Sequence, residues 1–264
     1  MPVFAHSSDG VRIAYERDGI GPPLILLHGG QMSRQSWHDA GYVDRLNQEF
    51  EVVTIDLRGN GESDKPVRPQ DYHVDRHCDD ILAVADACGI GRFALWGFSL
   101  GGNIGRYLAA QSSRVISLIM IGATFGLGAS GEFRRLTIEF CHHWTHILKN
   151  RAAGVLDIGS LSQQDQELLK TGNVPLIVSQ ASGILGWGDI QPKDVRCPTL
   201  WIAGSGNKPA MDGIEEYDAK LKGSKVRVQV IEGLNHSQEF SEVDKALPIM
   251  LSFTKAEGWS LSDY

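Results

Sequence analysis

Two short segments of this sequence contain the residue types that nucleophilic catalysis requires. Residues 97–101 read Gly-Phe-Ser-Leu-Gly, and residues 233–236 read Gly-Leu-Asn-His. A serine hydroxyl becomes a useful nucleophile when an imidazole within hydrogen-bonding reach accepts its proton. The G-x-S-x-G pattern is typical of a sharp turn from a strand into a helix, which exposes the serine hydroxyl. We therefore interpret Ser99 as a candidate nucleophile and His236 as its general base.

Acyl transfer also needs hydrogen-bond donors for the oxyanion that develops on the attacked carbonyl. The segment LILLHGG, residues 24–30, ends an apolar run in His-Gly-Gly, where a loop can turn a backbone N–H toward the serine. We assign the oxyanion-binding amides to Gly30 and Leu100. His28 is interpreted as a structural residue that braces the loop.

The surrounding pattern predicts an α/β fold that brings these segments to one edge of a sheet. Short, nearly continuous apolar runs indicate strands covered on both faces, as in a parallel sheet. They occupy 24–28, 52–56, 93–97, 115–122 and 199–204, with further strands at 11–17 and 226–231. Helical periods lie between them at 36–48, 75–88, 100–111, 213–222 and 238–256. Ligands of such sheets bind at the carboxyl ends of the strands.

One region lacks strand patterns and predicts a separate helical unit. Residues 125–190 contain only helical patches, so we expect a cap inserted into a core made of residues 1–124 and 191–264. Four aromatic side chains of this insertion are candidates for an apolar ceiling over Ser99, although packing of the cap on the sheet explains each of them equally well. They are Phe133, Phe140, Trp144 and Trp187.

Together these features resemble the α/β-hydrolase superfamily. The resemblance rests on LILLHGG with Trp37 downstream, IDLRGNGESDKP at 55–66, WGFSLGG at 96–102 and GLNH at 233–236, and it covers nearly the whole chain outside the cap. It implies an eight-stranded, mostly parallel sheet flanked by helices, a triad of serine, acid and histidine, and no metal or organic cofactor. The segment 56–63 is interpreted as a structural turn.

The sequence departs from this family at the acid of the triad. In the family the acid usually follows the strand written here as TLWIAG, about three residues beyond its last glycine, and that position is Asn207. An amide carries no charge, and in serine proteases the same replacement lowers kcat by about 10⁴. On this basis Asn207→Asp is predicted to raise kcat at least about tenfold.

An impaired triad is one interpretation of Asn207, and the sequence leaves alternatives open. Asp212, five residues further along, is the fallback acid, and Glu132 is the first acid after the preceding strand. A dyad that works without a carboxylate, or a fold retained for ligand binding, are further alternatives.

Composition limits the partners. The formal charge is −7, and the sequence has no run of basic residues that could bind along a phosphate backbone. We therefore do not expect nucleic acid as a partner. No stretch reaches the roughly 18 apolar residues of a membrane span, and the N-terminal segment does not resemble a signal peptide, so we expect a cytoplasmic protein. Its four cysteines, which form no CxxC pair, are expected to be reduced thiols. A homodimer is left open.

The sequence therefore predicts a serine hydrolase whose substrate is a small, largely uncharged carboxylic ester or lactone. Two alternatives remain. One is cleavage of a C–C bond or another non-hydrolytic reaction, because a fold does not fix its chemistry. The other is a ligand-binding protein with an impaired triad.

Overall fold

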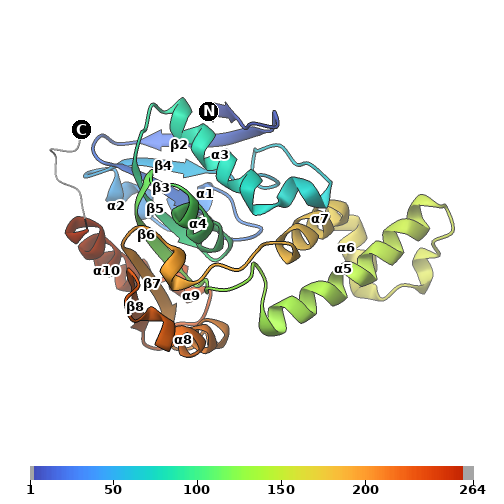
Figure 1. Ribbon diagram of the computed structural model, residues 1–264. Coiled ribbons are helices and arrows are strands. Elements are labelled where there is room, and N and C mark those ends of the chain that lie inside the picture. The colour runs from blue at the N-terminus through green and yellow to red at the C-terminus, as the bar shows by residue number, and fades with distance from the viewer. Residues whose placement is uncertain (1–2, 258–264) are drawn as a thin grey trace.

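The computed structural model describes residues 3–257 and contains one eight-stranded sheet in the order β1-β2-β4-β3-β5-β6-β7-β8 (Figure 1). Strand β2 pairs antiparallel with β1 and β4, whereas the strands from β4 onward across the sheet are parallel. The strands are β1 Val3–His6, β2 Arg12–Asp18, β3 Pro23–Leu27, β4 Glu51–Ile55, β5 Phe93–Phe98, β6 Val115–Ile121, β7 Thr199–Gly204 and β8 Val226–Ile231. This is the mostly parallel sheet that the sequence predicts.

Helices alternate with these strands. The α-helices are α1 Gln35–Asp39, α2 Tyr42–Leu46, α3 Val74–Ala87, α4 Leu100–Gln111, α5 Gly131–Ala152, α6 Gln163–Thr171, α7 Val174–Leu185, α8 Lys208–Leu221, α9 Gln238–Ser241 and α10 Val243–Ala256. Short 3₁₀ turns are η1 Pro69–Tyr72, η2 Ile158–Ser160 and η3 Pro192–Asp194.

The central strands are buried on both faces because side chains alternate between two apolar layers. In β3, Ile25 and Leu27 pack into the layer that includes α3 and α4, while Leu24 and Leu26 pack into the layer that includes α2 and α10. This alternation explains why the central strands are continuous apolar runs in the sequence. Because these strands run parallel to one another, their carboxyl ends lie at the same edge of the sheet.

The sequence misplaced some element boundaries. The single helix expected over 36–48 is two helices, because Gly41 adopts a left-handed backbone conformation with φ of 80° and starts α2 in a new direction. Helix α8 begins at Lys208, five residues before the expected start, and Asn207 caps its N-terminus. The short edge strand β1 was not predicted, because a run of four residues is too short to show the periodicity of a strand.

Three α-helices lie between β6 and β7, within the region expected to form a cap. Helices α5, α6 and α7 project to one side of the sheet (Figure 1) and share a small apolar cluster that includes Trp144 and Val178. The two ends of the insertion meet, since Gly126 and Ile190 exchange backbone hydrogen bonds of 2.8 and 3.0 Å. Arg106 of α4 donates to the Gly126 carbonyl at 2.6 Å and fixes this junction to the core.

Within residues 3–257 no helix is both long and apolar enough to cross a membrane. All four cysteines are free thiols, as expected, and three of them are buried. The cytoplasmic location and the state of assembly stay predictions.

Candidate active site

Ser99 stands at the turn between β5 and α4, as the G-x-S-x-G pattern predicts. Its backbone has φ of 50° and ψ of −110°, a strained conformation for a residue with a side chain. The turn is possible because a Cβ at Gly97 would lie 2.4 Å from the Gly101 backbone, and one at Gly101 would lie 2.3 Å from the Leu27 carbonyl oxygen. The Ser99 N–H donates to the Ile121 carbonyl at 2.7 Å, so the elbow is tied to the neighbouring strand.

His236 lies in the loop between β8 and α9 and faces this serine. Its Nε2 is 3.1 Å from Ser99 Oγ, and its ring stacks on Phe98 with the centroids 5.0 Å apart. The side chain is 47% exposed, so the imidazole has direct access to water. The two residues that the sequence singled out for chemistry are therefore within hydrogen-bonding distance.

His28 is buried and braces the loop after β3. Its Nδ1 lies 2.7 Å from the Gly29 carbonyl oxygen and its Nε2 accepts the Leu57 N–H at 3.1 Å, which identifies Nδ1 as the protonated nitrogen. Burial lowers the pKa of His28 to about 4, so the ring is neutral at pH 7. The structural interpretation of His28 is confirmed.

Gly30 lies in this loop, and the Leu100 N–H is the first of α4, where a helix leaves amides without internal partners. Their oxyanion-binding role stays a prediction.

Asn207 is buried and close to His236, yet its amide does not accept a proton from the imidazole. Its Oδ1 accepts the Ala210 N–H at 3.4 Å and caps α8, which turns the Nδ2 group toward the active site. Nδ2 lies 2.9 Å from both carboxylate oxygens of Glu239 and 3.1 Å from His236 Nδ1. Asn207 therefore presents donors to this part of the site.

The carboxylate beside the imidazole comes from Glu239, which sequence reasoning missed. Glu239 is fully buried on the short helix α9, and its Oε2 lies 3.0 Å from His236 Nδ1. Its Oε1 accepts the Gly204 N–H at 2.7 Å. The sequence signal that could have identified Glu239 is its position three residues after His236. This spacing places both side chains on the same face of a helical turn.

The fallback acids lie elsewhere, which corrects the sequence prediction. Asp212 forms an exposed ion pair with Lys208 one turn away on α8, because its side chain points from α8 to solvent. Glu132 forms an exposed ion pair with Arg135 on α5. The carboxylate that does face His236 is that of Glu239.

The four aromatic residues expected over Ser99 are distributed between the cap and the core. Trp187 is buried in the core layer, where its Nε1 donates to the Tyr72 carbonyl at 2.9 Å, so it does not line an open pocket and that part of the prediction is corrected. Phe140 and Trp144 pack against each other within the cap. Phe133 is 57% exposed near the start of α5.

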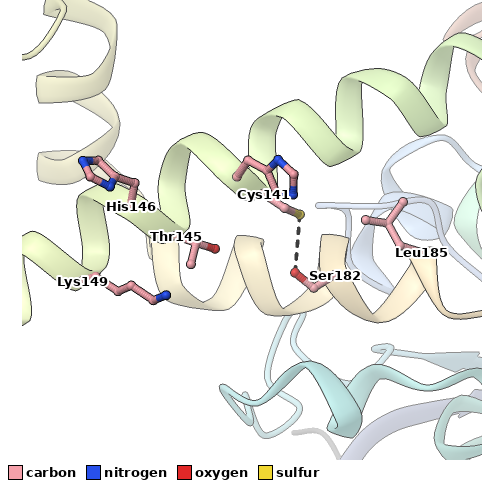
Figure 2. Close-up of a pocket in the computed structure, with 7 residues that line it drawn as sticks. Cys141, Thr145, His146, Lys149, Ser182 and Leu185 are labelled. Atoms are coloured by element: carbon pink, nitrogen blue, oxygen red, sulfur yellow. Dashed lines mark hydrogen bonds between the residues drawn. The ribbon is translucent and has the colours of Figure 1, made fainter.

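A pocket of about 500 Å³ lies in the cap between α5 and α7 (Figure 2). Cys141 and Ser182 are in contact in its lining, with the Ser182 hydroxyl 3.4 Å from the Cys141 sulfur. The lining is Cys141, His142, Thr145, His146, Lys149, Ser182 and Leu185. This lining includes neither Ser99 nor His236.

The fold agrees with comparisons to known proteins. The family described as alpha/beta hydrolase fold matches residues 22–161, more than half of the chain. The chain belongs to the α/β-hydrolase fold family.

The names of the relatives describe several different activities. A putative 2-succinyl-6-hydroxy-2,4-cyclohexadiene-1-carboxylate synthase from Bacillus subtilis (strain 168) is 32% identical over 48% of this chain and 46% of its own length. The chain thus matches less than half of that curated relative. Among solved structures, an esterase from Exiguobacterium antarcticum superposes with a TM-score of 0.75 at 21% identity, covering 97% of this chain and 100% of its own. An enol-lactonase from Burkholderia xenovorans LB400 gives 0.72 at 18% identity, covering 96% and 100%. At these identities the structures establish the fold alone.

Proposed function

We propose that this protein hydrolyses small, largely uncharged carboxylic esters or lactones through Ser99 and His236. The carrying observation is the 3.1 Å separation of Ser99 Oγ and His236 Nε2 at the carboxyl edge of the sheet. In the first half-reaction Ser99 Oγ attacks the carbonyl carbon while Nε2 takes the hydroxyl proton. The amides of Gly30 and Leu100 bind the oxyanion, and the imidazolium then protonates the leaving alcohol.

The second half-reaction releases the acyl group. A water molecule gives its proton to His236 Nε2 and attacks the acyl-serine carbonyl, and collapse of this intermediate returns the proton to Ser99 and frees the acid. Water has access to the imidazole because the side chain is about half exposed. This exposure supports hydrolysis over a reaction that must exclude water.

The relatives support the same class of substrate and leave room for another reaction. An esterase and an enol-lactonase share the fold over nearly their whole length. The relative named as a synthase supports the alternative, which is a C–C bond hydrolase or an enzyme of a non-hydrolytic reaction. The net charge of −7 disfavours an anionic substrate electrostatically.

The proposal is tested with a panel of short aryl esters and lactones and with a fluorophosphonate, which phosphonylates an activated serine. We expect turnover, and mass spectrometry to place the label on Ser99. Ser99→Ala should lose both, whereas Ser160→Ala, which removes an exposed hydroxyl in the cap, should keep both. A wild-type protein that neither turns over these substrates nor takes the label contradicts the proposal.

A further inference from the structure

The buried environment of Glu239 marks it as more than a packing residue. A carboxylate that is removed from water needs hydrogen-bond donors, and three groups supply them. The Gly204 N–H lies 2.7 Å from Oε1, the Asn207 amide lies 2.9 Å from each oxygen, and His236 Nδ1 lies 3.0 Å from Oε2. One of these three donors is thus the imidazole of the proposed general base.

The tautomer of His236 follows from its two neighbours. Because the Asn207 Oδ1 is used by the Ala210 N–H, the Asn207 group near the imidazole is a donor. Nδ1 therefore finds its acceptor in Glu239, and a protonated Nδ1 leaves the lone pair of Nε2 free for the Ser99 hydroxyl. Proton transfer from Ser99 requires this tautomer.

Gly122 leaves space for the carboxylate of Glu239, which lies on α9. A Cβ at Gly122, directly after β6, would lie 2.4 Å from Glu239 Oε2 and 2.8 Å from His236 Nδ1. Gly122 also has φ of 63°, so only glycine fits there without strain and without a clash. The lack of a side chain at Gly122 consequently leaves the space beside the imidazole that the Glu239 carboxylate occupies.

The same geometry explains why position 207 is an amide. A carboxylate at 207 would stand about where the Nδ2 of Asn207 now lies, 2.9 Å from the oxygens of Glu239, and two buried carboxylates at that distance repel each other. Asn207 and Glu239 are therefore a matched pair, in which the amide donates and the carboxylate accepts.

Resting on the hydrolytic function proposed above, we propose that Glu239 is the acidic partner of His236 and that Asn207 positions the Glu239 carboxylate. Glu239 holds the imidazole with Nδ1 protonated and stabilises the imidazolium that forms when Ser99 gives its proton to Nε2. The Nδ1 proton stays on the ring throughout, as in the known triads. Asn207 acts through Glu239 and does not substitute for the missing acid.

The experiment exchanges the two side chains. Glu239→Gln keeps the shape of the side chain and removes its charge, and kcat for a short aryl ester should fall by about 10² to 10⁴, with KM changed by less than about threefold. Asn207→Asp should also be less active than wild type. The double variant Asn207→Asp/Glu239→Gln, which restores one carboxylate and one amide, should exceed Glu239→Gln at least about tenfold. Glu242→Gln at the end of α9, an exposed partner of Lys245, is the matched control and should keep wild-type rates.

The melting temperature of each variant is measured together with its rate, to establish that the variant is folded. A folded Glu239→Gln with more than half of the wild-type kcat would overturn the proposal. So would a depressed kcat with no recovery in the double variant, which assigns Glu239 to packing alone. If Glu239→Gln does not fold, the double variant is compared with Asn207→Asp, and a double variant that is no more active than Asn207→Asp overturns the proposal.

Fluorophosphonate labelling separates this proposal from the hydrolytic one. A wild-type protein without label or turnover removes the proposed function. A wild-type protein labelled at Ser99 and a Glu239→Gln variant labelled at the same rate remove only the role of Glu239.

Discussion

The Asn207 amide nitrogen lies 2.9 Å from both carboxylate oxygens of Glu239, and one of these oxygens, Oε2, lies 3.0 Å from Nδ1 of His236. The asparagine that departs from the family pattern in the sequence is thus accompanied by a carboxylate on another element. This relationship supports the proposed pairing of Glu239 with His236 as the alternative to an impaired triad, because a carboxylate oxygen lies 3.0 Å from Nδ1 of the histidine.

The first prediction concerns the stability of Asn207→Asp, and it replaces the gain in activity expected from the sequence. The variant places two carboxylates about 3 Å apart in a buried site, so we expect a lower melting temperature than wild type at pH 7.5. The repulsion requires both groups to be ionised. The deficit should therefore shrink as the pH is lowered and one of them binds a proton.

Scanning calorimetry at pH 7.5 and pH 5 measures this difference, with Asn207→Asp/Glu239→Gln as the control that carries a single charge. A melting temperature of Asn207→Asp equal to that of wild type at both pH values would contradict the close pairing of the two residues.

Much of the fold and part of the site were accessible from the sequence. The G-x-S-x-G turn and the GLNH loop are local patterns, and their spacing to apolar strands placed Ser99 and His236 at one edge of the sheet. Glu239 was not found because the family pattern directs attention to the residue after β7. Its burial depends on a contact between α9 and the end of β7, and no local pattern encodes that contact.

The aromatic residues of the cap illustrate a different limit. Trp187 and Trp144 were candidates for a ceiling over Ser99, and both are buried. Which surface each one covers depends on how the insertion returns to the core. The antiparallel bridge between Gly126 and Ile190 brings the insertion back to the core, and Trp187 packs into the core layer just before that junction. Hydrophobicity predicts burial and does not predict the partner.

The second prediction tests the space left by Gly122. In Gly122→Ala the new methyl group meets Glu239 Oε2 and His236 Nδ1, so both side chains must move, and we expect kcat to fall about 10- to 100-fold. Gly89→Ala is the matched control, since Gly89 has φ of 72° and a methyl group there would have no heavy atom within 4 Å. Both variants should lose about 1–2 kcal/mol through backbone strain, and only Gly122→Ala should lose activity. Equal activities of the two variants would show that the position of Glu239 is unimportant for the rate.

The third prediction concerns two buried histidines. Burial lowers the pKa of His28 to about 4 and that of His77 to about 3, whereas an unfolded histidine titrates near 6.5. Because the folded pKa values are depressed, the stabilisation by the neutral rings is complete above pH 6.5 and is lost as the pH falls toward the folded values. Each histidine should weaken folding by about 1.4 kcal/mol per pH unit in this window.

Burial raises the pKa of Asp80, which contributes the opposite sign over part of the same range, so resolved titrations are the sharper measurement. The Cε1–H resonances of His28 and His77 should stay at their neutral positions from pH 8 to pH 5. The same protein unfolded in urea is the control, and its histidines should titrate near 6.5. Titration of His28 near 6.5 in the folded protein would exclude the buried, neutral ring that braces the Gly30 loop.

The last prediction tests how the cap is attached. Arg106 is buried and donates to the carbonyls of Gly126 at 2.6 Å and Leu127 at 2.9 Å, next to the bridge with Ile190. In Arg106→Met both carbonyls lose a charged donor, which should cost about 2–4 kcal/mol of unfolding free energy. The amide protons of Gly126 and Ile190, which are protected by the bridge, should exchange faster with solvent because the junction opens more often. Arg135→Met, which removes exposed ion pairs on α5, is the control and should leave both amides protected. Unchanged exchange at Gly126 in a folded Arg106→Met protein would mean that the bridge alone holds the junction.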